Sequence, residues 1–194
     1  MRLNIGKVLP SSLLLAAVGF SQQMAVDFDP AATKINWSLV GNVHTTHGTF
    51  QLKQGHVEVN AASGAVSGEL IVEANSGNSN DGARDKRMKK EILETDKFPE
   101  IRFRVTRIEG AQQLKVDQLK NAATVRAVGQ FTIHGSSHEI SIPMQVQING
   151  SDVSGTGKFV VPFVDWGMKD PSNFLFKVNK TVEVELVAAG HIKR

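Results

Sequence analysis

Residues 76–105, SGNSNDGARDKRMKKEILETDKFPEIRFRV, decide the fold, because the spacing of apolar residues changes here. Met88 and Ile92 lie one helical turn apart, whereas the segments on both sides alternate apolar and polar residues as strands do. The rest of the helix circumference is basic, with Arg84, Lys86, Arg87, Lys89 and Lys90. Four strand-like runs precede the helix and five follow it, which predicts a sheet interrupted once by a helix.

The residues that flank this helix predict where it begins and ends. Asn80 or Asp81 can accept hydrogen bonds from the first free backbone N–H groups and so cap the N-terminus. Pro99 disfavours helical geometry at Phe98, so the helix is expected to end before that residue. Two pairs of opposite charge are spaced four residues apart on its surface, Asp85 with Lys89 and Arg87 with Glu91.

The strand-like runs are short and are separated by turn signals. They occupy residues 34–40, 43–53, 57–59, 66–72, 101–105, 125–133, 140–148, 153–163 and 182–186. Gln54-Gly55 predicts a turn between the second and third runs, and Asn149-Gly150 predicts a tight hairpin. Residues 164–173 form an irregular stretch before the last run.

Short turns between successive runs predict antiparallel neighbours, and many strands with one apolar face each predict a barrel or a sandwich. A closed barrel is favoured because closure leaves no strand edge exposed. We therefore predict an all-β fold with one helical excursion, a closed antiparallel up-and-down β-barrel of about eight strands. A soluble barrel of that size holds either its own side chains or one small ligand.

Alternation alone does not say which face of the barrel is apolar. An outer-membrane barrel turns its apolar face outward and carries aromatic girdles at both membrane interfaces. The chain has no tyrosine and only two tryptophans, Trp37 and Trp166. This composition favours the soluble barrel with an apolar interior.

The first part of the chain has the pattern of an export signal. Residues 1–25 resemble a secretory signal peptide, because Arg2 and Lys7 precede an apolar run at residues 8–20. That run is too short to span a bilayer comfortably. The cleavage site stays open, either at the end of this segment or after Ser21. Residues 26–194 then form a single barrel domain.

Charge and cysteine content exclude several classes of function. Without Arg2 and Lys7, the 22 basic residues fall to 20 against 19 acidic ones, a net charge of +1. The basic character therefore indicates export, and we predict no nucleic-acid partner. The chain has no cysteine, which excludes a disulfide framework, thiolate chemistry and cysteine-ligated metal.

Histidines are the candidates for metal chemistry: His44, His47, His56, His134 and His138. His44 and His47 are three residues apart, so in a regular strand they face opposite sides and do not converge. A metal-dependent hydrolase is therefore only an alternative. The sequence has no nucleophile beside a base, no phosphate-binding glycine loop and no paired acids at a definable site. We predict no catalytic residues, no metal and no cofactor.

Two further features each have two interpretations. Trp166, in the segment 165–172, either plugs one end of the barrel or closes over a ligand at its mouth, and we prefer the plug. The basic face of the helix is either a solvated surface, as charge runs usually are, or a docking face for an anionic membrane.

Several separated motifs together resemble the YceI-like family of exported polyisoprenoid-binding proteins. They are HTTHGTF at 44–50, RDKRM at 84–88, FPEIRF at 98–103, GQFTIHG at 129–135 and DWGM at 165–168. The resemblance covers residues 26–188 in order. It implies a lipocalin-like barrel whose apolar interior takes a long isoprenoid chain, in the periplasm of a Gram-negative bacterium. The ligand class stays open between polyprenyl and quinone-type lipids, and the oligomeric state stays open too.

The apolar faces of the strands and of the helix predict which residues bind such a lipid. They are Trp37, Phe50, Leu70, Met88, Ile92, Phe103, Gly129, Phe131, Met144, Gly157, Phe159 and Trp166. The glycines among them either leave room for a ligand chain or let curved strands bend, and at Gly129 we expect room for the ligand. Besides a carrier or buffer for isoprenoid lipid, the alternative is a structural or envelope-stress protein with a filled barrel.

Overall fold

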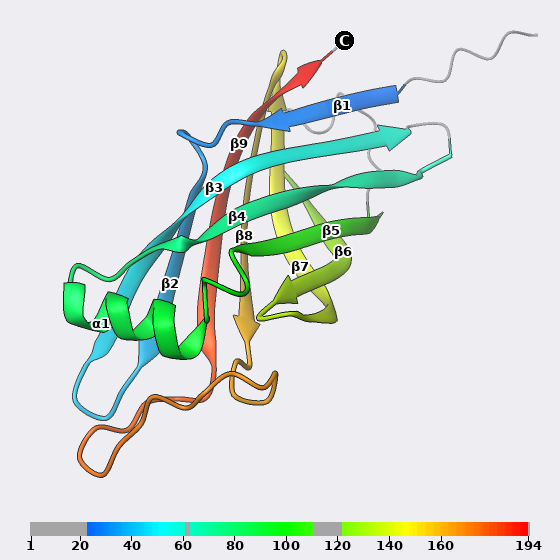
Figure 1. The fold of residues 1–194 in the computed structure, drawn as a ribbon. Helices are drawn as coiled ribbons and strands as arrows, with labels where there is room; N and C mark the ends of the chain where they lie inside the picture. The colour runs from blue at the N-terminus through cyan, green and yellow to red at the C-terminus, as the bar shows by residue number, and fades with distance from the viewer. Residues whose placement is uncertain (1–22, 61–62, 111–121, 194) are drawn as a thin grey trace, which may run out of the picture.

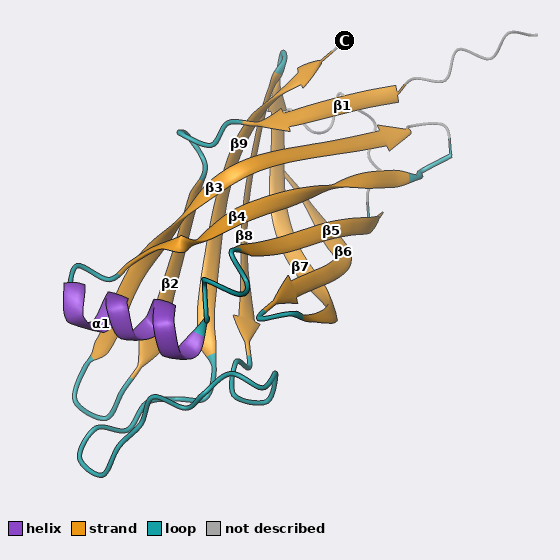
Figure 2. Ribbon diagram, in the orientation of Figure 1, coloured by secondary structure: helices purple, strands orange, loops and turns teal. Residues whose placement is uncertain are grey.

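A closed antiparallel β-barrel with one helical excursion forms the protein, as predicted (Figures 1 and 2). The computed structural model describes residues 23–60, 63–110 and 122–193. The strands are β1 (Gln23–Phe28), β2 (Lys34–Val40), β3 (Thr45–Asn60), β4 (Val66–Asn78), β5 (Glu100–Glu109), β6 (Ala123–Ile133), β7 (Ser136–Asn149), β8 (Asp152–Val161) and β9 (Val182–Lys193). Most of the predicted signal peptide, residues 1–22, lies outside the described ranges.

The nine strands of the described residues occupy eight positions around the barrel, because β1 and β2 share one position. Strands β2 to β9 follow one another around the barrel, and pairing of β2 with β9 closes it at one end. At the other end β1 pairs with the same two neighbours, β3 and β9. Between β1 and β2, Pro30 has no N–H to donate to a strand ladder. The buried Thr33 then rejoins the sheet, and its hydroxyl donates to the carbonyl of Ala189 at 3.2 Å.

Two sequence-based expectations on the N-terminal side are corrected by this arrangement. The turn predicted at Gln54-Gly55 is wrong, because β3 runs through it as one strand with only a shift in its register against β4. Gly55 serves close packing instead, since a Cβ there would lie 3.0 Å from the Cβ of Phe28. Strand β1 was not predicted, because its residues overlap the end of the expected signal peptide.

The helix begins where the sequence predicts and then changes type. Asp81 caps α1 (Gly82–Arg87), and its Oδ1 accepts hydrogen bonds of 3.0 Å from the N–H groups of Ala83 and Arg84. The chain continues as a π-helix, η1 (Met88–Ile92), and so ends well before Phe98. Arg87 and Glu91 pair at 3.6 Å. The remaining predicted pair is replaced by another contact, because Asp85 accepts hydrogen bonds from the N–H and hydroxyl of Ser79.

The helix and the irregular residues 162–181 lie at the same end of the barrel, opposite the end where β1 joins (Figure 1). Apolar side chains of the strands point inward, and residues such as Leu52, Leu70 and Phe131 form one buried cluster. No helix in the described ranges is long and apolar enough to cross a bilayer.

Candidate functional site

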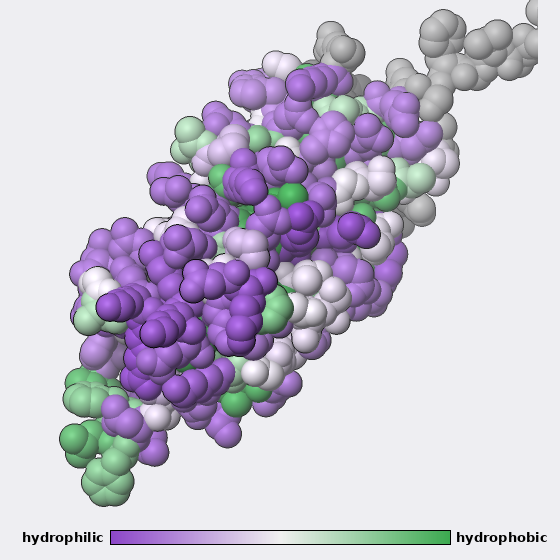
Figure 3. Space-filling view, in the orientation of Figure 1, coloured by the Kyte–Doolittle hydropathy of each residue, from purple (hydrophilic) through white to green (hydrophobic). Residues whose placement is uncertain are grey.

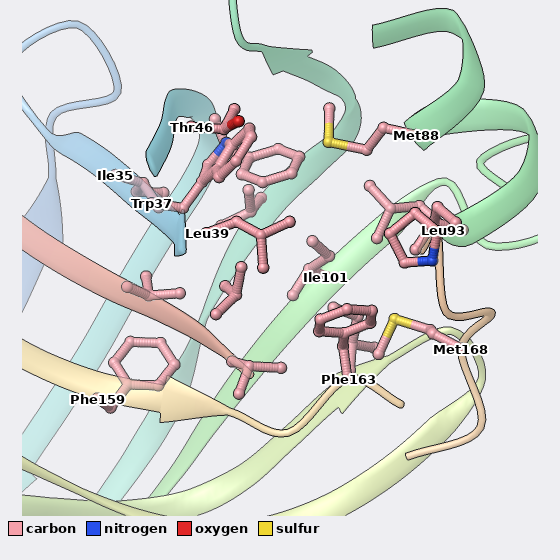
Figure 4. Close-up of a pocket in the computed structure, with 18 of the residues that line it drawn as sticks. Ile35, Trp37, Leu39, Thr46, Met88, Leu93, Ile101, Phe159, Phe163 and Met168 are labelled. Carbon is pink, nitrogen blue, oxygen red and sulfur yellow. The ribbon is translucent and has the colours of Figure 1, made fainter. Parts of the chain in front are cut away.

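An apolar cavity of about 440 Å³ lies inside the barrel, toward the end covered by the helix. Side chains from β2 to β9, from α1 and η1 and from residues 162–181 line it (Figure 4). Its walls are almost entirely aliphatic and aromatic, which suits an apolar ligand with few polar groups.

Most of the predicted ligand-binding residues meet in this cavity. Those that line it are Trp37, Phe50, Leu70, Met88, Ile92, Phe103, Phe131 and Phe159. They come from seven different elements, so the barrel and not any single segment brings them together. Gly129, Met144, Gly157 and Trp166 are absent from the lining.

The expectation that Gly129 leaves room for a ligand chain is wrong. A Cβ there would lie 2.1 Å from the carbonyl oxygen of Arg104, on β5, where that strand shifts register against β6. Gly157 is similar, because its Cβ would lie 2.3 Å from the Sδ of Met144 and 2.8 Å from the carbonyl oxygen of Pro143. Both glycines therefore allow close approach of neighbouring chain segments, and neither leaves room for a ligand chain.

Met144 and Trp166 belong to the packed part of the interior. Met144 is buried in the core cluster. The Trp166 ring stacks on His138 with centroids 4.0 Å apart, and its centroid lies 5.9 Å from that of Phe131. This packing agrees with the interpretation of Trp166 as a plug.

Trp37 lines the cavity with its ring, and its polar atom is buried. The indole lies flat against β3, where a Cβ on Gly48 would come within 2.3 Å of the ring. Its Nε1 is buried and has no hydrogen-bond partner among the described residues. Because that atom is itself covered, Trp37 contributes only apolar surface to the cavity wall.

The π-helix directs apolar side chains into the cavity end. Met88, Ile92 and Leu93 all line the cavity, and the N–H of Leu93 donates to the carbonyl of Met88 at 2.9 Å. Gly77 makes room for this packing, since a Cβ there would lie 2.7 Å from Met88 Cε and 2.8 Å from Phe50 Cε1. Single-turn π-helices of this kind occur frequently at functional sites.

Sequence reasoning missed several lining residues. Leu39 shares the phase of Trp37, so alternation could have included it. Leu93 adjoins Ile92 on the helix and could have been inferred in the same way. Phe163 and Met168 come from the irregular segment after β8, where no period assigns an inward face.

An ion pair ties the helix to the irregular segment at the end of the cavity. Lys169 Nζ lies 2.7 Å from Glu91 Oε2, and the hydrogen bond from Lys169 lowers the pKa of the Glu91 carboxyl. Arg84 is held in place as well, because it donates to the hydroxyl and the carbonyl of Ser79 at 2.8 and 2.9 Å. Lys169 and Arg84 thus lie at the helix end of the cavity, here called its mouth, and the apolar side chains line the interior.

The five candidate histidines do not converge. His56 lies 2.5 Å from Asp27 beside β1, His134 lies 2.8 Å from Glu94 after the π-helix, and His138 stacks on Trp166. No group of three metal-ligating side chains occurs in the part of the chain that the structure describes. The hydrolase alternative has no assembled site there.

The pair of His56 and Asp27 predicts a pH-dependent stability. Hydrogen bonds from the His56 ring to the carboxylates of Asp27 and, second in size, of Glu58 raise the pKa of His56 above its ordinary value of 6.5. The stabilising contribution is therefore complete below pH 6.5 and is lost as pH rises through the raised pKa. NMR titration should show His56 titrating above 6.5, and Asp27→Asn should lower that midpoint. In His56→Gln, the fall in unfolding free energy above neutral pH should be smaller than in the wild type; an identical fall would contradict the prediction.

Comparison with known proteins places the fold in a family. The family model of the YceI-like domain matches residues 27–189. The chain belongs to the YceI-like family. The resemblance carried by the five motifs is thereby confirmed. No curated protein matches the chain in sequence.

Several solved structures share the barrel. Burkholderia cenocepacia BcnA has a TM-score of 0.67 at 18% identity, covering 84% of this chain and 99% of that one. A polyisoprenoid binding domain from Saccharophagus degradans, implicated in plant cell wall breakdown, has a TM-score of 0.68 at 16% identity, covering 87% and 98%. The Campylobacter jejuni YCEI protein has a TM-score of 0.55 at 13% identity, covering 100% and 95%. At such identities the likeness establishes the fold.

Proposed function

We propose that this YceI-like protein binds an isoprenoid lipid inside its barrel and serves as a carrier or buffer for it in the periplasm. The observation that supports this most is the apolar cavity of about 440 Å³ lined from all round the barrel. The polyisoprenoid binding domain of Saccharophagus degradans, with the same fold, supports the choice of ligand class. The signal-like residues 1–25 support export.

The energetics of an apolar chain fit such a site. Burying a five-carbon isoprene unit contributes up to about 4 kcal/mol, at roughly 0.8 kcal/mol for each apolar carbon. Ordering the chain and losing its translational freedom reduce that gain considerably. A few buried units still suffice for micromolar binding or better, without a charged recognition site. The head group, polyprenyl or quinone-type, would then lie toward the polar mouth.

Binding and not catalysis is the proposed activity. The family and its binding-domain relative favour a binding protein. Among the described residues that line the cavity, no hydrogen bond joins a nucleophile to a base. Among the polar side chains at the cavity, Arg84 and Arg87 already have hydrogen-bond or ion-pair partners in the protein.

Mass spectrometry of organic extracts tests the proposal directly. Protein exported in a Gram-negative host and purified without detergent is expected to release an isoprenoid lipid in near-stoichiometric amount. An extract that contains only traces of bulk phospholipid would contradict it and would favour the filled, structural barrel.

The ion pair at the mouth predicts faster lipid exchange when it is broken. Lys169→Met removes the contact with Glu91 that joins the helix to residues 162–181. The pair is exposed, so the expected acceleration of lipid release is modest, up to about fivefold. Lys158→Met is a matched control, because Lys158 is similarly exposed and pairs with Glu185 at 3.3 Å on the barrel wall. Equal release rates for both variants would contradict a gating role; the measurement is transfer of a fluorescent isoprenoid to acceptor vesicles.

A further inference from the structure

The tip of the irregular segment carries apolar side chains without partners. Phe174, Leu175 and Phe176, here called the apolar tip, are 94%, 68% and 55% exposed. Figure 3 shows them as a hydrophobic patch projecting from the end of the molecule where residues 162–181 lie. Val43, on the neighbouring turn before β3, is 65% exposed as well. A concentration of large exposed apolar side chains at one end of a protein marks an interaction surface.

The backbone holds the apolar tip in this outward position. The side-chain oxygen of Asn173 accepts hydrogen bonds from the N–H groups of Leu175 and Phe176 at 2.9 and 2.8 Å. Asn42 connects the tip to the turn before β3 by two hydrogen bonds. Its Nδ2 donates to the carbonyl of Leu175 at 3.2 Å, and its Oδ1 accepts from the N–H of Lys177 at 3.1 Å. These hydrogen bonds therefore fix the conformation of the loop that carries the apolar side chains.

Charge around the apolar tip favours an anionic partner. Between Asp170 and Glu183 the chain carries Lys177 and Lys180 and no acidic residue. The hydrophilic surface above the patch in Figure 3 belongs to the basic helix. Apolar side chains with basic residues beside them are typical of segments that insert at the surface of an anionic bilayer.

The apolar tip also adjoins the cavity. Phe176 lines the cavity and is half exposed, and Pro171, Asn173 and Val178 of the same loop line it too. A surface that covered the tip would therefore meet the end of the cavity formed by this loop.

We propose that the apolar tip inserts into the surface of an anionic lipid bilayer and docks this end of the barrel there. The proposal rests on the proposed function, because docking matters for a cavity that holds lipid. A lipid that left through water would expose its chain, and each exposed methylene would slow release about fourfold. A tip inserted beside the cavity allows the chain to pass between bilayer and barrel with less exposure.

Vesicle flotation tests this directly. The probe is vesicles of phosphatidylethanolamine with phosphatidylglycerol, and the variant is Phe174→Ser with Leu175→Ser. Neither side chain lines the cavity, and both are exposed, so the barrel should fold. The wild type is expected to float with the vesicles, and the variant's partition coefficient should fall about tenfold or more. Val160→Ser, at a 55% exposed position on β8, is the matched control and should float like the wild type.

Other occupants of the apolar tip give different results. Equal flotation of the variant and the wild type would overturn the proposal. A wild-type dimer that the variant dissociates, without vesicle binding by either, would overturn it in favour of a second copy of this chain. Lipid binding in detergent micelles, measured on the same variant, separates the two hypotheses. A further outcome is a wild type that holds no isoprenoid and still floats while the variant does not. That result would support docking and contradict only the proposed content of the cavity.

Discussion

Val184→Trp is expected to exclude lipid from the barrel while leaving the protein folded. Val184 lies on β9 opposite Trp37 of β2 and Phe159 of β8, and all three side chains line the cavity. An indole at this position would occupy much of the space between them. We expect lipid retention to fall about tenfold or more, since several isoprene carbons lose their site. The delipidated variant should be as stable as the wild type or more so, because the added ring fills empty space.

The control for this prediction is on the outer wall of the barrel. Val160→Trp makes the same chemical change on β8, at a residue that pairs with Glu183 and is 55% exposed. It should keep its lipid. The measurement is the molar ratio of extracted isoprenoid to protein, together with the denaturant midpoint after delipidation. Full lipid occupancy in Val184→Trp would show that the ligand lies elsewhere.

Gly129→Ala is expected to destabilise the barrel strongly although it adds one methyl group. The new Cβ would lie 2.1 Å from the carbonyl oxygen of Arg104 and 2.9 Å from its carbonyl carbon. These are backbone atoms, so relief requires β5 and β6 to separate and not merely a side chain to rotate. Overpacking in a core destabilises by about 1–3 kcal/mol, and we expect the upper end of that range. The melting temperature should then fall by roughly 6–12 °C.

Gly155→Ala is the matched control for this effect. Its Cβ would lie 3.2 Å from the flexible end of Met144, at Cε, and no closer than 3.7 Å to any other atom outside its chain neighbours. The substitution should leave stability unchanged or raise it by about 0.5 kcal/mol, because alanine restricts the unfolded chain. Thermal and denaturant unfolding of both variants measure the difference. Equal stability of the Gly129→Ala and Gly155→Ala variants would show that the strands at Gly129 can accommodate a Cβ.

Local sequence signals predicted the features that depend on near neighbours. The change of period at Met88 and Ile92 located the helix, and Asp81 caps it as expected. The hairpin at Asn149-Gly150 joins β7 to β8, and Gly150 has a φ of 65°, which glycine adopts readily. Such features are decided by a few successive residues, so one chain segment contains the information.

The wall of the candidate site was predictable for the same reason. Trp37, Phe50 and Phe159 share the apolar phase of their strands, and a closed barrel directs that phase inward. The prediction failed at Gly129, because alternation gives the face of a residue and not the distance to the next strand. Phe163 and Met168 were missed since no period exists in an irregular loop.

The order of the amino acids was therefore enough to predict a barrel with an apolar interior and one basic, capped helix, because periodicity and capping act over a few residues. The three-dimensional packing was needed to see that β1 and β2 share one position in the barrel and that Gly129 faces a neighbouring backbone. It also decided that the segment carrying Phe174 and Phe176 closes one side of the cavity. These features depend on how residues far apart in the chain pack against one another, and a pattern within one segment carries no information about that distance.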